Sequence, residues 1–212
     1  MTAEAAAREQ ITRVGHSLFA RGLTAGSSGN ISLKLDDSWL ITPTNSCLGD
    51  LDPAQISCIA HNGQQRSGAP PSKEWFFHKA AYEARQSVGA IVHLHSTHAA
   101  AVSCIADLDR HNCLPPLTAY HVMRVGEVPL LPYFRPGDAA LGPAVGGLVR
   151  QHTAVLLANH GPVVVGRTLE AALYAAEELE ETAKLFLLLR NHRYSPLSEP
   201  QIEDLRRHFS PG

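Results

Sequence analysis

The sequence predicts an α/β protein built around one central sheet, because two kinds of hydrophobic pattern alternate along it. Short apolar runs typical of buried strands alternate along the chain with longer segments whose apolar residues recur at helical spacing. Such alternation is typical of a sheet covered by helices. The chain has 212 residues, of which 44% are hydrophobic, and this is enough for one domain with a substantial core. We therefore expect a single domain over residues 1–212.

The N-terminal part predicts one helix followed by strands. Residues 3–21 have apolar residues at helical spacing, Thr2 can cap this helix, and Gly22 lies beyond its end. The loop LTAGSSGN then leads into an alternating strand at residues 31–35, and DDS turns the chain into a second strand, WLIT. After the loop TPTNSCLGDLDP we expect a further strand at ISCIA, before a turn at HNGQQ.

The central part predicts a helix, a buried strand and a second helix. PPSKEWFFHKAAYEAR indicates a helix over residues 73–85, with Ser72 as its cap. GAIVHLH is typical of a buried strand, and STHAAAVSCIA of a helix that begins just after it. The segment 114–138 is expected to be irregular, with short strands around residues 122–124 and 128–131.

The C-terminal part predicts two strands between two helices. Residues 138–152 are expected to be helical, TAVLLANHG is a strand that ends in a glycine turn, and VVV is a further short strand. Thr168 can cap a long helix over residues 169–190. Its acidic run EELEE is typical of a solvent-exposed face, on which Glu180 would pair with Lys184. The remaining tail is polar.

Composition excludes several classes of protein. The formal net charge is −2 and no basic stripe is present, which argues against a nucleic-acid partner. No apolar run reaches the ~18 residues that a membrane span requires, and the N-terminal segment MTAEAAAREQ has no apolar core of a signal peptide. The four cysteines show no CxxC spacing, so we expect reduced, mostly buried thiols. These features indicate a cytoplasmic protein with no membrane partner.

A pair of histidines stands at the end of the apolar strand IVHLH. Because side chains on a strand repeat every two residues, His93 and His95 emerge on the same face. Two adjacent imidazoles resist joint protonation, and a metal ion uses both as neutral ligands. A histidine taken alone is more often a hydrogen-bonded core or surface group, so the pair predicts a metal site without excluding a structural role.

Two further residues are candidate ligands. His160 follows the buried strand AVLLAN where the chain turns, and strand ends are where sites form in α/β folds. Glu74 lies at the start of the predicted helix, where it could equally complement the helix dipole. Three imidazoles and a carboxylate would suit zinc or another divalent cation, and an open coordination position would make the metal catalytic.

Two loops are candidate anion sites. The backbone donors of AGSSGN, with its Asn and Ser side chains, can cradle a phosphate, and TPTN offers another hydroxyl and amide. Neither segment has the spacing of a nucleotide P-loop, and ordinary turns have the same composition.

Taken together and in this order, the motifs GNIS, ITPT, PSKEW, HLHSTHA and LLANHG resemble the class II aldolase/adducin family over roughly residues 5–190. The resemblance implies a three-layer α/β/α fold with a central, mostly antiparallel sheet, and a homotetramer of four-fold symmetry. It also implies a divalent metal, Zn²⁺ or another such as Mn²⁺ or Co²⁺, and a small phosphorylated sugar or sugar-acid substrate.

The resemblance assigns roles to individual positions. The metal-binding histidines of the family correspond to His93, His95 and His160. Glu74 corresponds to the acid/base carboxylate, which also approaches the metal when no substrate is present. The substrate phosphate is placed at Gly29, Asn30, Thr44 and Ser72.

Three positions depart from the sugar-phosphate aldolases of this family. The phosphate-loop glycine is Asn45, the second serine before the glutamate is Lys73, and the catalytic tyrosine falls at Val122. Tyr120 lies two positions earlier and is the alternative candidate for a catalytic tyrosine.

The segments HLHSTHAAAVSCIADLD and ANHGPVVVG are similar to those of the decarboxylases of this family that act on 3-oxo-tetronate 4-phosphates. This likeness implies formation of dihydroxyacetone phosphate and CO₂ through a metal-stabilised enediolate, and the absence of tyrosine at Val122 favours decarboxylation over aldol cleavage. The alternatives are an aldolase or epimerase of the fuculose or ribulose phosphate type, and a non-catalytic adducin-like binding module.

Overall fold

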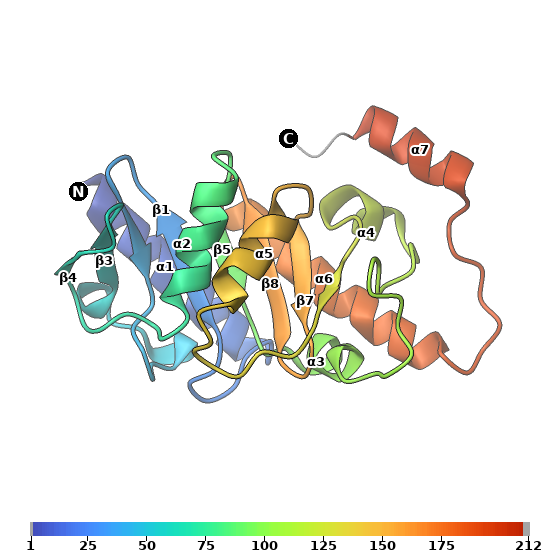
Figure 1. Ribbon diagram of the computed structural model, residues 1–212, viewed down its shortest axis with the longest axis horizontal. Helices are drawn as coiled ribbons and strands as arrows, with labels where there is room; N and C mark the ends of the chain where they lie inside the picture. The colour runs from blue at the N-terminus through green and yellow to red at the C-terminus, as the bar shows by residue number, and fades with distance from the viewer. Residues whose placement is uncertain (1, 210–212) are drawn as a thin grey trace.

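An eight-stranded sheet forms the centre of the computed structural model, which describes residues 2–209 (Figure 1). Along the sheet the strands follow the order β4-β3-β2-β1-β5-β8-β7-β6. All neighbours are antiparallel except β6 and β7, which run parallel. The strands are β1 (Asn30–Lys34), β2 (Ser38–Ile41), β3 (Ser57–Ala60), β4 (Gln65–Ser67), β5 (Ala90–His93), β6 (Leu130–Leu131), β7 (Ala154–Leu157) and β8 (Gly161–Gly166).

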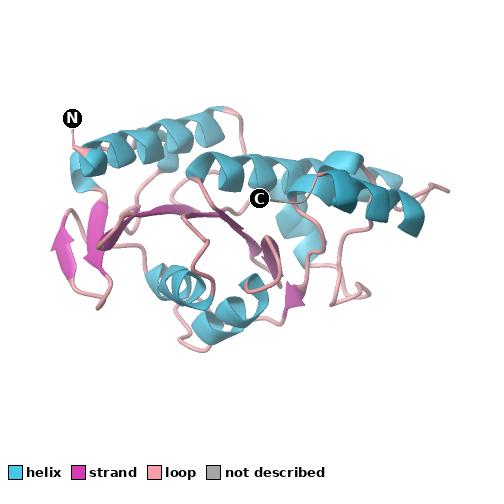
Figure 2. Ribbon diagram, turned by 90° about the horizontal axis from the view of Figure 1, so that it is seen from above, coloured by secondary structure: helices cyan, strands magenta, loops and turns pink. Residues whose placement is uncertain are grey.

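Helices cover both faces of this sheet, which gives three layers (Figure 2). Residues of α1 and α6 share one hydrophobic cluster with one face of the strands, and residues of α2 and α5 share a second cluster with the other face. The helices are α1 (Ala3–Ala20), α2 (Trp75–Ala84), α3 (Thr97–Ser103), α4 (Ala119–Arg124), α5 (Leu141–Val149), α6 (Leu169–Leu189) and α7 (Glu199–His208), with short 3₁₀ turns η1 (Leu48–Asp50) and η2 (Pro53–Gln55). The predicted α/β/α fold with a mostly antiparallel sheet is confirmed.

The alternation of the central strands explains why both faces are covered. In β5, Ala90 and Val92 belong to the cluster under α1 and α6, whereas Ile91 faces the cluster under α2 and α5. His93 continues this alternation, so it lies on the α2 side of the sheet. None of the helices within residues 2–209 combines the length and apolar character that crossing a bilayer requires.

Several predicted elements need correction. Residues 122–124 are not a strand but part of α4, because the Thr118 side chain accepts a hydrogen bond from the His121 amide at 3.0 Å and caps a helix there. Helix α2 begins at Trp75 rather than at residue 73. The preceding Pro71 forms a bridge with Pro43, so the chain before Glu74 is extended.

Two elements were not predicted. Strand β4 is exposed and polar throughout, so no hydrophobic alternation marks it, and it forms by pairing with β3. Helix α7 lies in the polar tail, where Ser198 and Gln201 make a reciprocal capping box. The prediction of mostly buried thiols holds in part: all four cysteines are unpaired, but only Cys58 and Cys113 are buried.

The prediction that Glu180 is solvent-exposed is wrong, and the reason bears on the site. Glu180 lies on the buried face of α6 and is 4% exposed. Its carboxylate accepts hydrogen bonds from the backbone amides of His98 and Ala99, each at 2.9 Å, and contacts His98 Nδ1 at 2.8 Å. These amides belong to the first turn of α3, and first-turn amides have no hydrogen-bond acceptor within their own helix. A carboxylate from another helix therefore caps α3.

Replacing Glu180 with Ala is expected to destabilise the protein by about 1–3 kcal/mol, because it leaves buried helix amides without acceptors. The matched control is Glu181→Ala, since Glu181 is an exposed neighbour on the same helix and its loss should cost less than about 0.5 kcal/mol. Urea unfolding of both variants measures the difference. Equal stabilities of the two variants would contradict the assigned capping role.

Candidate metal centre and active site

The end of β5 places the first two histidines. His93 is the last residue of β5 and is fully buried, and His95 follows two residues later on the same side of the chain. The two segments that flank this one in the sheet approach it very closely. A Cβ atom at Gly161 would lie 2.2 Å from the Leu94 carbonyl oxygen, and one at Gly29 would lie 2.8 Å from the His93 carbonyl oxygen. Only glycine allows both neighbouring strands to close on the histidine pair.

The turn between β7 and β8 places the third histidine. Asn159 has φ 56°, a left-handed conformation that asparagine tolerates, and the His160 amide donates to the Leu157 carbonyl at 3.1 Å. The His160 amide also lies 3.2 Å from Ser103 Oγ, at the end of α3. Helix α3 thus follows His95 in the chain and supports the turn that carries His160.

The fourth residue, Glu74, stands immediately before α2. It is the N-cap residue of the helix, and its amide lies 3.3 Å from Ser72 Oγ. Its carboxylate points to the histidines rather than back to the helix, and Asn30 Nδ2 donates to Glu74 Oε2 at 2.8 Å. The helix-dipole role that the sequence left open therefore does not account for where this side chain lies.

These four side chains converge on one point. The Nε2 atoms of His93 and His95 are 3.1 Å apart, and those of His95 and His160 are 2.8 Å apart. Glu74 Oε2 lies 3.3 Å from His93 Nε2, and Glu74 Oε1 lies 3.4 Å from His160 Nε2. All four candidate ligand atoms lie within 4.8 Å of one another.

The chemistry of this donor set fits a divalent cation. His93 Nδ1 lies 2.9 Å from the Pro162 carbonyl, to which it can only donate, and this hydrogen bond leaves the Nε2 lone pair facing the cluster. The lone pairs of three such nitrogens and a carboxylate oxygen would repel one another, whereas a cation between these four atoms is attracted to all of them. Nitrogen and oxygen donors in this number suit zinc and similar divalent ions.

Burial and the mutual charges of the cluster shift its ionisation when no cation is bound. Burial lowers the pKa of His95 to about 3 and of His160 to about 4, and the charge of a protonated His93 acts in the same direction. Burial also acts to lower the pKa of His93, but the Glu74 carboxylate and the Pro162 carbonyl outweigh it and raise this pKa, so His93 must lose a proton when a cation binds. Burial alone would raise the pKa of the Glu74 carboxyl, but the neighbouring His93 and His160 outweigh this effect and hold it below its usual range. His95 and His160 are therefore neutral at physiological pH, as metal ligands must be.

The residues predicted to bind the substrate phosphate lie beside Glu74. Asn30 Nδ2 is 3.1 Å from Ser72 Oγ, and the Thr44 amide donates to Pro70, two residues before Ser72. Gly29 directly precedes Asn30 and has φ 79°. Asn45 has φ 56°, a left-handed conformation that asparagine tolerates. The structure brings these loops together, and phosphate binding there stays a prediction.

Tyr120 is not brought to this cluster within one chain. It is 58% exposed on α4, which lies at the end of the central strands away from α3 (Figure 1). Its ring contacts Arg124, whose guanidinium carbon is 5.5 Å from the ring centroid. A catalytic role for Tyr120 stays a prediction, and it would require the Tyr120 of another copy of the chain.

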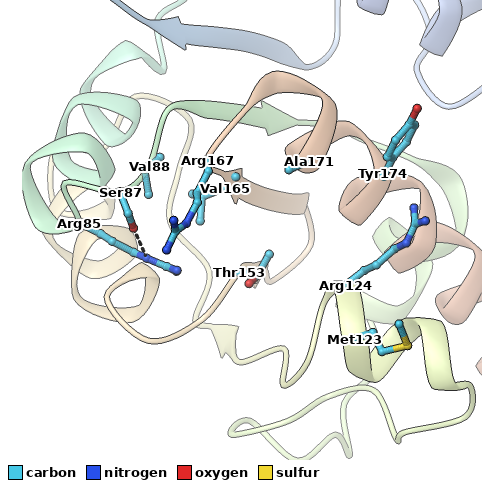
Figure 3. Close-up of a pocket in the computed structure, with 11 residues that line it drawn as sticks. Arg85, Ser87, Val88, Met123, Arg124, Thr153, Val165, Arg167, Ala171 and Tyr174 are labelled. Atoms are coloured by element: carbon cyan, nitrogen blue, oxygen red, sulfur yellow. Dashed lines mark hydrogen bonds between the residues drawn. The ribbon is translucent and has the colours of Figure 1, made fainter. Parts of the chain in front are cut away.

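A separate cavity of about 250 Å³ lies at the opposite end of β5 and β8 (Figure 3). Arg85, Arg124 and Arg167 line it together with apolar side chains such as Val88 and Val165. The described residues that line it include no histidine, cysteine or carboxylate. It therefore offers a divalent cation no imidazole, thiolate or carboxylate ligand.

The comparison with known families agrees with this geometry. The class II aldolase and adducin N-terminal domain family matches residues 9–187, which include all four candidate ligands. The chain belongs to this family. As a class II aldolase-family protein it is 48% identical over 206 residues to a 3-oxo-tetronate 4-phosphate decarboxylase of Pectobacterium atrosepticum, covering 97% of this chain and 94% of that protein.

More distant relatives in the same family are aldolases. An L-fuculose phosphate aldolase of Escherichia coli is 37% identical over 170 residues, covering 78% of this chain and 75% of that protein. Among solved structures, YgbL of Klebsiella pneumoniae superposes with a TM-score of 0.94 at 47% identity, over 97% of this chain and 100% of that chain. A solved L-fuculose 1-phosphate aldolase superposes with a TM-score of 0.85 at 26% identity, over 99% and 97%.

Replacing His95 with Ala is expected to remove most of the bound metal, because it deletes the imidazole that contacts both other histidines. After loading with Zn²⁺ and desalting, the wild type should retain about one ion per chain, as a site of this kind does. Elemental analysis measures the retained metal. His111→Ala, at an exposed histidine outside the cluster, is the matched control. Full occupancy in His95→Ala would rule out this ligand set.

Proposed function

We propose that this chain is a carboxy-lyase that converts a 3-oxo-tetronate 4-phosphate to dihydroxyacetone phosphate and CO₂. The observation that carries the proposal is the convergence of Glu74 with three imidazoles whose Nε2 atoms meet at one point. It is supported by near full-length relatives of this chain at 48% identity that bear the name of this activity.

The reaction breaks one carbon–carbon bond. The substrate carries a carboxylate at C1, a hydroxyl at C2, a ketone at C3 and the phosphate at C4. When the C1–C2 bond breaks, its electron pair remains on C2 and is delocalised onto the C3 oxygen, and one proton added to C2 then completes dihydroxyacetone phosphate. His93, His95 and His160 would hold a divalent cation, which would supply Lewis-acid stabilisation of the developing negative charge.

Glu74 is the residue proposed to deliver the proton to C2. It lies at the edge of the metal cluster and is mostly buried, with 14% of its side chain exposed. A carboxyl group in such a position transfers a proton without help from bulk water. In the substrate complex the protonated carboxyl, rather than the carboxylate, is the form that gives C2 its proton.

The phosphate is proposed to bind beside Glu74, at Gly29, Asn30, Thr44 and Ser72. These residues offer neutral hydroxyl, amide and backbone donors. Such donors bind a dianion through charge-assisted hydrogen bonds, and this is compatible with the net charge of −2. The phosphate would hold C2 and C3 at a fixed distance from the histidines.

Val122 favours decarboxylation over aldol cleavage, on the proposal that α4 reaches the site from another copy of the chain, as for Tyr120. An aldolase needs an acid/base group at the departing aldehyde oxygen, and the tyrosine of related aldolases is replaced here by a side chain that transfers no proton. The retained cluster of four ligands argues against a non-catalytic adducin-like module. The alternative of a fuculose or ribulose phosphate aldolase or epimerase is tested directly by offering those sugar phosphates to the loaded protein.

Several finer points are part of this proposal. We infer that the cation is Zn²⁺ or a similar ion such as Mn²⁺ or Co²⁺, since the donor set is three imidazoles and one carboxylate. The homotetramer, the single domain over residues 1–212 and the cytoplasmic location are predictions that rest on the sequence and on the family.

Glu74→Gln is expected to lower the rate of dihydroxyacetone phosphate formation by ~10²–10⁴-fold, the usual effect of removing a proton-transfer group. Glutamine keeps the size and polarity of the side chain, and the three imidazoles that hold the cation remain, so metal content and substrate affinity should change little. Turnover of 3-oxo-tetronate 4-phosphate by Zn²⁺-loaded protein, followed by coupled detection of product, measures the loss. Glu83→Gln, at an exposed carboxylate on α2, is the control. Undiminished turnover in Glu74→Gln would move the proton donor elsewhere.

Thr44→Val tests the phosphate site. Valine lacks the threonine hydroxyl but has nearly the same side-chain shape. Because a hydrogen bond to a charged group contributes about 1.5–3 kcal/mol, KM should rise at least about tenfold. Thr153→Val, in the arginine-lined cavity at the other end of the sheet, should leave KM unchanged. A KM for Thr44→Val equal to that of the wild type would show that the phosphate binds elsewhere.

A further inference from the structure

Behind Glu74, a line of buried polar side chains leads away from the metal cluster. Asn30 Nδ2 donates to Glu74 Oε2 at 2.8 Å, and Asn30 Oδ1 lies 2.5 Å from His78 Nε2. His78 Nδ1 in turn lies 2.7 Å from Ser32 Oγ, which lies 2.7 Å from the hydroxyl of Tyr82. Asn30, Ser32 and His78 are 3% exposed or less, in a layer otherwise filled with apolar side chains.

The direction of each hydrogen bond in this line follows from its first member. A carboxylate only accepts, so the NH₂ group of Asn30 must face Glu74 and its carbonyl oxygen must face His78. His78 Nε2 must then carry the proton. A neutral imidazole has one donor and one acceptor nitrogen, so His78 Nδ1 accepts from the Ser32 hydroxyl. Tyr82 then donates to Ser32. Burial favours this neutral form, because it lowers the pKa of His78 to about 3.

His78 reinforces from the other end the orientation that the Glu74 carboxylate imposes on Asn30. The two ends of an amide side chain have nearly the same shape, so packing alone does not distinguish them. Asn30 Nδ2 also donates to Ser72 Oγ at 3.1 Å, but a hydroxyl accepts or donates and would tolerate either orientation. The N–H of His78 does not, because it can bond only to the carbonyl end of Asn30.

We propose that His78 is a positioning residue of this enzyme: it holds the Asn30 amide so that its NH₂ group fixes Glu74 Oε2. The inference rests on the proposed role of Glu74 in protonating C2, and it adds the residue that sets the orientation of the Glu74 carboxylate.

The effect of His78 is expected mainly in kcat. His78→Leu removes the donor that anchors the Asn30 carbonyl oxygen while keeping a buried apolar side chain, so Glu74 loses its fixed orientation. Misplacing a catalytic group by about 1 Å costs ~10²-fold, so kcat should fall by about this factor. KM should change less than kcat, because Gly29, Thr44 and Ser72 still bind the phosphate, and zinc content should be unchanged. His78→Gln can donate from an amide placed near Nε2, and it should restore kcat at least about tenfold above His78→Leu.

Tyr82→Phe distinguishes positioning from general packing of the buried line. In this variant the Ser32 hydroxyl can still donate to His78, so the orientation of Asn30 is kept and kcat should fall far less than in His78→Leu. If Tyr82→Phe and His78→Leu lower kcat equally, or if His78→Gln is no more active than His78→Leu, the line is only structural and the proposal fails.

A measurement without turnover tests the same inference. In full-length metal-free protein labelled with ¹⁵N-histidine, long-range ¹H–¹⁵N spectra should show His78 as the Nε2–H tautomer, and this signal should be absent from His78→Gln. A proton on Nδ1 would overturn the proposal, because Asn30 would then face Glu74 with its oxygen. This result does not depend on the reaction, so an inactive wild type with the expected tautomer would refute the proposed function and leave the positioning of Asn30 standing.

Discussion

The close approach of four ligand groups is the constraint on which the rest of this structure depends. The candidate ligand atoms of three imidazoles and a carboxylate lie within 4.8 Å of one another, and two pairs of imidazole nitrogens are in direct contact. The fold holds them from three sides: the end of β5, the turn between β7 and β8, and the N-terminus of α2. Gly29 and Gly161 allow the neighbouring strands to approach, and α3, capped by Glu180, supports the turn of His160.

Much of this could be read from the sequence, because the relevant signals are local. The strand period places His93 and His95 on one face, and the turn after AVLLAN places His160 at a strand end. The line of buried polar side chains behind Glu74 could not be predicted from such local signals. His78 has the appearance of one more residue of an amphipathic helix, and Ser32 of an outward-facing strand residue, until the packing of α2 on β1 buries both.

The corrections have the same origin. Glu180 belongs to a run of acids that is typical of an exposed helix face, yet tertiary contact with α3 turns it into a buried cap. The sequence around Val122 predicts a strand, whereas the Thr118 cap makes these residues helix α4. This helix carries Tyr120 away from the metal cluster of its own chain, so the tyrosine that sequence spacing offers does not reach the cluster within one chain. Contacts between segments distant in sequence decided each case.

The central claim, that C1 leaves as CO₂ and C2 receives one proton from Glu74, is tested most directly by isotopes. Zn²⁺-loaded protein is incubated in D₂O with 3-oxo-tetronate 4-phosphate labelled with ¹³C at C1, and the products are followed by NMR. We predict that all of the ¹³C appears as CO₂ and bicarbonate, and that dihydroxyacetone phosphate carries one deuterium at a single prochiral position of its hydroxymethyl carbon. Retention of ¹³C in a sugar product, or deuterium distributed equally between the two positions, would contradict the account.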